Sequence, residues 1–381
     1  MTVQYKSMQH LAIFSSENSG LNTWNRIGSL HRELAIYKKL TENAWKVSFF
    51  TYDKSPKPPN IGFNASIHPQ WPFWMPKKLN PVYCKFLPLR FLKMGTTIDV
   101  IITNQAHSPG PAVQAAKLWN AKLIARCGYV YGESATVLGK SGKRVQKRIA
   151  VERHTFENAD MCVVPTDKLK DWIAENYSID AGKVAVIPNY VDTNIFRPVK
   201  KTEMPCDIIC IGRLVGKKRH ELLIMALEGT ALRLLIIGNG KLKGRLQQLA
   251  AQLNVNLKIL PRVEHRQLPE YLNNATIYAN LSRWEGHPKG LIEAMACGCA
   301  CIGAKSPGIE NLITDGETGK LVAPELGQIR NTVETLLKDK KTAQQLGKAA
   351  RSCAVAEFSL GKVAEQYEKV FKEALHKYKQ V

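Results

Sequence analysis

The residues best suited to chemistry are two glutamates, Glu285 and Glu293, which enclose a stretch containing two glycines and a proline. An apolar run at 275–281 precedes them and predicts a buried strand. Pro288 suits the first turn of a helix, where its missing N–H costs nothing, and Gly298 can end that helix. Glu285 should therefore lie in a loop at the carboxyl end of a strand, and Glu293 about one turn into the next helix.

This arrangement suits the recognition of a phosphorylated sugar. The glycines leave backbone N–H groups unobstructed at the start of the helix, and such groups attract phosphate. Carboxylates repel anions but accept hydrogen bonds, so the two glutamates fit sugar hydroxyls. For either glutamate alone, an exposed loop or a solvated helix face is the better explanation. The spacing of glycine and proline between strand and helix favours a site.

The segment from Trp284 to Glu293 resembles the Glu-x7-Glu motif of the retaining glycosyltransferases of family 4, and residues 294–298 continue the likeness. The resemblance covers roughly the second half of the chain and is weaker over the first. It implies an α/β protein with the GT-B fold, in which two Rossmann-like doubly wound domains face a cleft and a C-terminal helix crosses back to the first domain. It also implies a nucleotide-sugar donor as co-substrate and no further cofactor. The sequence contains no Asp-x-Asp, so no metal ion is implied.

Domain boundaries follow from a polar, proline-bounded stretch from Lys200 to Pro205. We expect an N-terminal acceptor-binding domain over residues 1–198 and a nucleotide-sugar-binding domain over 199–360. Residues 361–381 should form the helix that packs back on the first domain.

A basic cluster follows the strand predicted at 207–211. The resemblance assigns Arg213 and Lys218 to the donor diphosphate. The chemistry agrees, because an arginine fork and a lysine point charge at a strand end can neutralise a pyrophosphate. Lys217 and Arg219 are also compatible with a basic surface turn.

The resemblance therefore implies a complete set of site residues. The catalytic residues are expected to be Arg213, Lys218 and Glu285. The substrate-binding residues are expected to be Gly28, Gly238, Val263, His287, Pro288, Lys289, Gly290, Leu291 and Glu293. Glu285 would orient the sugar and Glu293 the ribose, while His287 would contact the sugar or a donor phosphate. Val263 would border the base. Gly238 belongs to a Gly-x-Gly, which is a weak signal alone.

The first half alternates strand and helix patterns, as a doubly wound sheet requires. Residues 11–14 predict its first strand, 15–27 a polar loop and 29–40 an amphipathic helix. Relatives carry a Gly-Gly pair after the first strand, facing the donor phosphates. This chain lacks the pair, and Gly28 is preferred to Gly20 because it directly precedes the helix.

Two features of the first half concern the acceptor. Residues 69–94 interleave aromatic and basic side chains, which suits a membrane–water interface or an irregular loop packed on its own domain; they include Trp71, Trp74, Lys77 and Lys78. A helix predicted at 140–153 carries Arg144, Lys147 and Arg148 on one face, for an anionic acceptor, lipid head groups or plain solvent. Many relatives have a histidine near the loop that follows residues 123–125, and this chain has none there.

Composition limits the cellular setting. The formal charge of +22 indicates an anionic partner, which a nucleic acid, an anionic membrane or a phosphorylated substrate would satisfy. Nine scattered cysteines do not form a disulfide framework, and a reducing cytosol is the simplest compartment. No uncharged apolar run is long enough to span a membrane, and no signal-peptide pattern is visible. We expect a cytoplasmic protein, peripheral at the inner face of the membrane if the first domain binds lipid.

The best-supported function is that of a retaining hexosyltransferase, which moves a sugar from a nucleotide sugar to a glycan or lipid-linked acceptor in cell-envelope polysaccharide or glycolipid synthesis. A nucleic-acid-binding α/β protein is an alternative that the charge supports, although no nucleic-acid motif does. A sugar-nucleotide epimerase on the same fold is another. A nicotinamide dehydrogenase is disfavoured, because the first strand is not followed by Gly-x-Gly-x-x-Gly.

Overall fold

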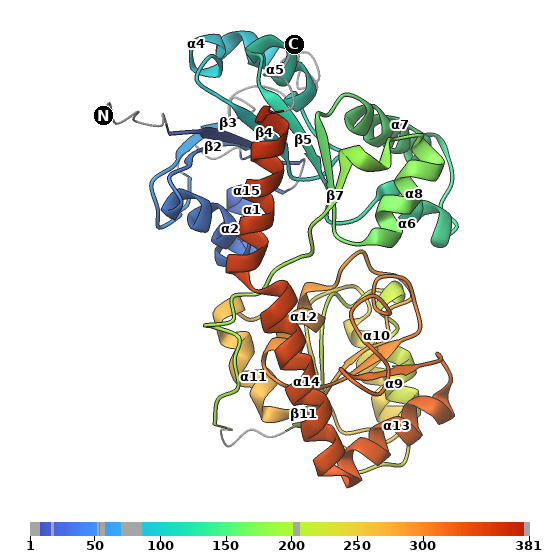
Figure 1. Cartoon of the computed structure of the whole chain (residues 1–381). Coiled ribbons are helices and arrows are strands. Elements are labelled where there is room, and N and C mark those ends of the chain that lie inside the picture. Colours follow the sequence, from blue (N-terminus) through green and yellow to red (C-terminus); the bar gives the residue numbers. More distant parts are fainter. Residues whose placement is uncertain are drawn as a thin grey trace. The chain divides into compact units, whose positions relative to one another are not determined.

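The structure, a computed structural model, describes residues 8–16, 19–51, 53, 58–69, 86–200 and 206–376. The chain divides into two compact units (Figure 1). The first contains residues 1–187 together with 364–381, and the second contains residues 188–363. This division lies earlier in the chain than the boundary expected after residue 198, and slightly later than the one expected after residue 360.

The first unit is built on a seven-stranded parallel sheet. Its strands are β1 (His10–Phe14), β2 (Lys46–Thr51), β3 (Ser66–Pro69), β4 (Val100–Thr103), β5 (Lys122–Arg126), β6 (Met161–Val164) and β7 (Val184–Val186). They lie in the order β3-β2-β1-β4-β5-β6-β7. The central strand β1 is fully buried and mostly apolar, as a strand covered by helices on both faces must be. The order reverses between β1 and β4, which is where ligands bind in such sheets.

Helices connect these strands. They are α1 (Leu21–Arg26), α2 (Leu30–Glu42), α4 (Leu92–Gly95), α5 (Ala112–Trp119), α6 (Tyr131–Val137), α7 (Lys143–Glu157) and α8 (Asp167–Tyr177). The expectation of an uninterrupted loop at 15–27 is wrong, because α1 occupies part of it. Its two buried residues, Leu21 and Trp24, have the i, i+3 spacing of a helix, but a single such pair is too short a pattern to predict one.

The second unit repeats the plan with a six-stranded parallel sheet. Its strands are β8 (Cys206–Ile211), β9 (Leu234–Ile237), β10 (Leu257–Leu260), β11 (Ala275–Asn280), β12 (Ala300–Ala304) and β13 (Lys320–Val322), in the order β10-β9-β8-β11-β12-β13. Its helices are α9 (His220–Ala226), α10 (Lys243–Gln252), α11 (Leu268–Asn274), α12 (Lys289–Ala296), α13 (Leu326–Lys338) and α14 (Lys340–Phe358). The sheet order reverses between β8 and β11, so these two strands mark the expected ligand-binding edge.

The last helix, α15 (Leu360–His376), is red in Figure 1. From Ala364 onwards it belongs to the first unit. The Phe371 ring packs edge-on against Trp45 at 5.2 Å, and the Tyr367 hydroxyl accepts a hydrogen bond from Arg126 Nε at 3.3 Å. The C-terminal helix therefore completes the core of the unit that begins the chain. Among the described residues, no helix combines the length and apolar composition of a membrane span.

One buried carboxylate organises the first unit beyond β5. Glu152 of α7 is fully buried and accepts hydrogen bonds from the backbone N–H groups of Tyr131 at 2.7 Å and Gly132 at 2.9 Å. The Tyr177 hydroxyl also donates to it at 2.9 Å. Burial raises the pKa of Glu152 to about 7, although all three hydrogen bonds oppose that shift. Gly132 lies against Tyr177 and Trp172, so that a methyl group has no room there.

Replacing Gly132 by Ala should destabilise the first unit by ~1–3 kcal/mol, because the added methyl forces Tyr177 away from Glu152. The matched control is Gly244→Ala in α10, where no atom lies within 4 Å of the added carbon. That change should be neutral or stabilise by roughly 0.5–1 kcal/mol, because alanine favours a helix over glycine. Urea unfolding followed by circular dichroism measures both, and equal effects from the two substitutions would contradict this account of the packing.

Candidate functional site

The loops that follow β8 and β11 form the candidate site of the second unit. These strands are parallel neighbours, so their carboxyl ends lie at the same edge of the sheet. The first loop contains a short 3-10 helix, η3 (Gly216–Lys218), and the second runs from Leu281 to Pro288. The backbone N–H of Arg283 donates to the Lys217 carbonyl at 2.8 Å, which joins the two loops directly. The basic cluster and the first glutamate predicted from sequence therefore meet.

Glu285 forms the centre of this junction. One of its oxygens, Oε1, lies 2.6 Å from Lys218 Nζ, and the other, Oε2, lies 3.6 Å from Lys217 Nζ. Burial alone would raise the pKa of the Glu285 carboxyl, but the two lysines outweigh it, and the pKa falls below its ordinary value. Lys217 also lies 5.0 Å above the Trp284 ring, and its burial lowers the pKa of its ammonium group. The carboxylate is thus charged at neutral pH and held between two cations.

The backbone around Glu285 is fixed as well. Its N–H donates to the Pro307 carbonyl at 3.0 Å, in the loop after β12. Gly308 packs against the Glu285 carbonyl and has a φ of +81°, so only glycine fits there. Ser306 Oγ donates to the Ser282 carbonyl at 2.8 Å. Three consecutive strand ends of the sheet therefore determine where the carboxylate points.

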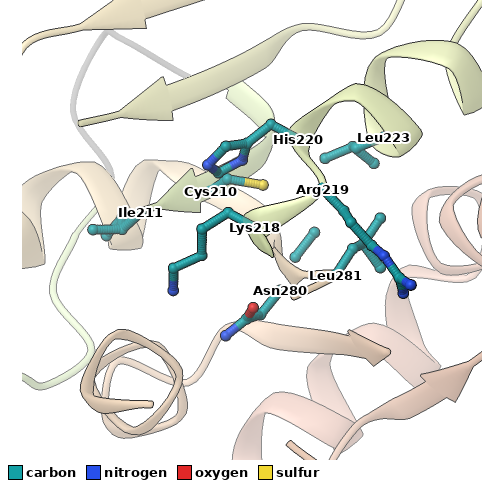
Figure 2. Close-up of a pocket in the computed structure, with 9 residues that line it drawn as sticks. Cys210, Ile211, Lys218, Arg219, His220, Leu223, Asn280 and Leu281 are labelled. Atoms are coloured by element: carbon teal, nitrogen blue, oxygen red, sulfur yellow. The ribbon is translucent and has the colours of Figure 1, made fainter. Parts of the chain in front are cut away.

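A small pocket opens at the ends of β8 and β11 (Figure 2). Its lining comprises Cys210, Ile211, Lys218, Arg219, His220, Leu223, Ala279, Asn280 and Leu281. The Lys218 and Arg219 side chains diverge from each other, and Lys218 is the one that pairs with Glu285. Arg213 is exposed in the same loop and does not line the pocket. The pocket marks the strand ends and does not include the whole set of predicted residues.

Gly238 has a structural reason to be glycine. It lies directly against the Gly212 carbonyl, so a side chain there would push the loop after β9 away from the loop after β8. Gly212 in turn is covered by Lys218, whose Cε would be 3.2 Å from an added Cβ. The two glycines allow the Lys218 side chain to lie flat over the strand ends. Val263 follows β10 in the same unit and is partly buried.

Glu293 is not solvated. It lies in α12, is 2% exposed, and its Oε1 lies 2.8 Å from His265 Nε2. The His265 ring packs on Phe196 at 4.8 Å between centroids. Sequence reasoning missed His265, because a lone histidine in a polar stretch carries no spacing signal. The second glutamate is thus anchored from behind by an imidazole.

His287 has partners within its own unit. The Asn189 N–H donates to its Nδ1 at 3.3 Å, the Asn189 side chain donates to its carbonyl at 2.7 Å, and its ring meets Phe358 edge-on at 5.4 Å. Burial lowers the pKa of His287 to about 3, so the ring is neutral. With Nδ1 accepting the Asn189 N–H, the remaining proton resides on Nε2. The ring's first role is therefore to tie the loop to Asn189.

The residues that follow His287 begin α12. Pro288 is the residue before the first turn, and Lys289, Gly290 and Leu291 open the helix. An added Cβ on Gly290 would be 2.9 Å from the Tyr278 hydroxyl, so the helix start lies close against β11. Gly298, with a φ of +76°, follows the end of the helix as predicted.

Gly28 belongs to the first unit. Its φ is +63° and its N–H donates to the Asn25 carbonyl at 2.9 Å, which closes α1. Gly20, not Gly28, precedes the first helix after β1. Gly28 immediately precedes Ser29, the N-cap of α2, and the turn that closes α1 explains the positive φ that favours glycine there. Among the described residues, no group of three or more His, Cys, Asp or Glu is placed to hold a metal ion.

Comparison with known families identifies the chain. Residues 34–195 match the model of Glycosyltransferase Family 4, and residues 191–352 match that of Glycosyl transferases group 1. The two matches follow one another along most of the chain. This protein belongs to the family 4 type of glycosyltransferases.

Curated relatives of this glycosyltransferase match it over part of their length. It is 32% identical over 211 residues to the N-acetylgalactosamine-N,N'-diacetylbacillosaminyl-diphospho-undecaprenol 4-alpha-N-acetylgalactosaminyltransferase of Campylobacter jejuni, covering 53% of this chain and 57% of that protein. It is 31% identical over 146 residues to the N-acetyl-alpha-D-glucosaminyl L-malate synthase of Bacillus anthracis, covering 38% of each chain. The chain therefore spans less than two thirds of the length of these relatives.

Solved structures establish the fold of this glycosyltransferase as GT-B. The sucrose-phosphate synthase of Thermosynechococcus elongatus superimposes with a TM-score of 0.76 at 20% identity, covering 96% of this chain and 98% of that one. Anabaena HepE, solved in complex with UDP and glucose, gives a TM-score of 0.74 at 17% identity, covering 96% and 100%. At these identities the likeness concerns the fold alone.

Acid should weaken the second unit through His287. The buried ring has a pKa of about 3 when folded and 6.5 as its ordinary value, so the unfolded chain binds an extra proton between these values. The unfolding free energy should therefore fall as pH drops below about 6.5, by at most ~1.4 kcal/mol per pH unit from this group. His287→Asn, which keeps an acceptor for Asn189, should reduce that slope in denaturant titrations from pH 7 to pH 4. His154→Asn, at an exposed histidine, is the control, and parallel curves for all three proteins would contradict the prediction.

Proposed function

We propose that this glycosyltransferase moves a sugar from a nucleotide-sugar donor to a glycan or lipid-linked acceptor, with retention at the anomeric carbon. Its place would be the synthesis of cell-envelope polysaccharide or glycolipid. The observation that carries the proposal is the ion pair of Lys218 and Glu285 at the ends of β8 and β11. This pair provides both a cation for a diphosphate and a carboxylate for sugar hydroxyls at one point.

The charges define a role for each residue. As the bond between sugar and diphosphate breaks, negative charge grows on the phosphate oxygens, and Arg213 and Lys218 are placed to stabilise it before the reaction begins. A donor diphosphate that attracts Lys218 leaves Glu285 free to accept hydrogen bonds from the sugar. The donor's own phosphate assists the incoming hydroxyl, so the proposal needs no protein nucleophile and no metal ion.

The relatives support the two substrate classes. HepE is solved with UDP and with UDP-glucose, and the Campylobacter jejuni enzyme is named for a diphospho-undecaprenol acceptor. We assign the donor to the second unit, where Arg213, Lys218 and Glu285 lie, and the acceptor to the first. Glu293 is proposed to hold the ribose hydroxyls while His265 fixes its carboxylate from behind.

A thermal-shift panel of nucleotide sugars, measured in EDTA, tests the donor class, because a bound ligand raises the unfolding temperature. Calorimetry with the matching nucleoside diphosphate should then show that Arg213→Ala and Lys218→Ala each weaken binding by ~1.5–3 kcal/mol, the range of a charge-assisted contact. Arg219→Gln removes a charge next to Lys218 on a side chain that diverges from it, and it should change the affinity less than about twofold. Equal losses of affinity in all three variants would show that the diphosphate responds to the general positive charge of the surface and not to a site formed by Arg213 and Lys218.

Glu285→Gln should lower the turnover rate, measured as nucleoside diphosphate released from the donor, by roughly 10²-fold or more. Binding of the free diphosphate should not weaken, because the carboxylate no longer competes for Lys218. Glu293→Gln should instead reduce the ratio of the affinity for a nucleoside diphosphate to the affinity for its 2′-deoxy form, because the proposed partner of Glu293 is the ribose hydroxyl that the 2′-deoxy form lacks. Full turnover in both variants, with an unchanged circular dichroism spectrum, would show that the two glutamates are not part of the donor site.

We also propose that the first unit contacts an anionic membrane. Residues 70–85 of the aromatic–basic stretch, which include Trp71, Trp74, Lys77 and Lys78, lie outside the described residues. In the described part of the same stretch, Phe86 and Leu89 are 58% and 54% exposed. On α7, Arg144, Lys147 and Arg148 are all exposed, and exposed cations attract anionic head groups at about 1 kcal/mol each.

Vesicle co-sedimentation tests this membrane contact. The chain should sediment with phosphatidylglycerol vesicles, much less with phosphatidylcholine vesicles, and less at high salt, because screening shortens the reach of exposed charges to about 8 Å at physiological ionic strength. Replacing Trp71, Trp74, Lys77 and Lys78 together should abolish the difference. Negligible binding to both vesicle types would refute the membrane contact and leave the transferase proposal unaffected.

A further inference from the structure

Three aromatic rings from two loops meet at one edge of the first unit's sheet. His107 follows β4, and Tyr129 and Tyr131 follow β5. The His107 ring lies 5.4 Å from the Tyr129 ring and 5.3 Å from the Tyr131 ring, between centroids. Strands β4 and β5 are parallel neighbours, and β4 borders the point where the strand order reverses. This is the edge at which parallel sheets bind ligands.

His107 has an unmet hydrogen-bonding capacity. Its Nδ1 is buried and has no hydrogen-bond partner among the described residues. Burial and the charge of Arg148 lower the pKa of His107 to about 4, so the ring is neutral at physiological pH. A neutral imidazole has one nitrogen that donates and one that accepts, which matches a hydroxyl group. A buried polar atom without a hydrogen-bond partner lowers the stability of the folded state, so a ligand that supplies the partner gains from binding there.

Helix α7 holds the loop after β5 in place and adds a positive charge beside it. Glu152 accepts the backbone N–H of Tyr131 and of Gly132. One turn earlier on the same face of α7, the Arg148 guanidinium lies 5.4 Å from the Tyr131 ring centroid. Arg148 is exposed, so its charge remains available beside the ring. A single helix thus fixes the backbone at Tyr131 and places a cation beside the ring of the same residue.

We propose that His107, Tyr129 and Tyr131 bind a sugar ring of the acceptor, and that Arg148 meets a phosphate attached to that sugar. The inference rests on the proposed function and names the acceptor class as a glycosyl phosphate ester. The phenol rings supply apolar faces with polar edges, which suit the mixed surface of a pyranose. The imidazole binds a hydroxyl, and the guanidinium fork pairs with phosphate oxygens.

Saturation-transfer NMR with small sugar probes measures this binding directly. The probes are glucose, galactose, mannose, N-acetylglucosamine and N-acetylgalactosamine, each as the methyl glycoside and as the α-1-phosphate. We expect at least one sugar to bind through its ring C–H protons, and its 1-phosphate to bind about fivefold or more tightly than its methyl glycoside. A citronellyl diphosphate ester of the same sugar tests whether the natural acceptor is lipid-linked. If it is, the ester should bind more tightly than the sugar 1-phosphate; if the natural acceptor is a free sugar phosphate, the 1-phosphate should bind at least as tightly as the ester.

Three variants assign the contacts. His107→Phe keeps the ring and removes its nitrogens, and Tyr131→Leu removes the ring and keeps the N–H that Glu152 holds; both should weaken every bound probe by about tenfold. Arg148→Gln should remove only the preference for the 1-phosphate. Arg153→Gln, on the same helix and paired with Glu157 at 2.9 Å, is the matched control and should change nothing.

Nucleoside diphosphate binding in the second unit distinguishes failure of the sugar site from failure of the proposed function. If the natural chain binds no nucleoside diphosphate, the proposed function itself fails. If it binds the diphosphate but no sugar probe, or if the three variants bind the sugars as well as the natural chain, the aromatic cluster is not the acceptor site. Retention of diphosphate binding in each variant shows that the chain is folded.

Discussion

The contact between the Glu285 carboxylate and the Lys218 ammonium governs the geometry of the second unit's site. Each group is mostly removed from water, so each depends on the other to offset its loss of hydration. Breaking such a pair by deleting one partner costs ~3–5 kcal/mol when it is buried. The loops after β8 and β11 must therefore approach closely enough for the two side chains to meet. The loops on either side are as tightly placed: Gly238 of the loop after β9 lies against the Gly212 carbonyl, and Gly308 of the loop after β12 lies against the Glu285 carbonyl, with no room for a side chain at either glycine.

The first unit also contains a buried carboxylate, but the loss of hydration is offset by different partners. There the carboxylate of Glu152 receives backbone N–H groups from the loop after β5, and the compensation comes from hydrogen bonds instead of a cation. Burial prevails in this case, and the pKa of Glu152 rises, whereas the two lysines keep the pKa of Glu285 low. Glu152 is thus a fastening for the loop that carries Tyr131, and Glu285 stays charged at the strand ends. The charge state of each buried acid is therefore set by the groups that surround it.

Much of this could be read from the sequence, and the exceptions have physical causes. Strand positions and the helix starting near Pro288 follow from periodicity and from the proline and glycine at the helix ends. The family resemblance assigns both Lys218 and Glu285 to the site, but their direct contact depends on β8 and β11 being neighbours in the sheet, which periodicity does not encode. The partner of Glu293, by contrast, comes from a segment near residue 265 whose only signal is a single histidine. The approach of His107 to Tyr129 and Tyr131 depends on which way two loops fold over neighbouring strands. Hydrophobic patterns encode which face of a strand is buried, but they do not encode how loops close above it.

The contribution of α15 to the first unit has a consequence for biosynthesis. A ribosome makes the chain from its N-terminus, and domains generally fold as they emerge. The second unit is interposed, so residues 188–363 are complete before Tyr367 and Phe371 exist. Until then Trp45 lacks its aromatic neighbour, and Arg126 lacks one of its hydrogen-bond partners. The first unit is therefore the first to be synthesised and the last to be complete. The part of its core that α15 covers in the finished protein is the surface that a nascent-chain chaperone would have to protect.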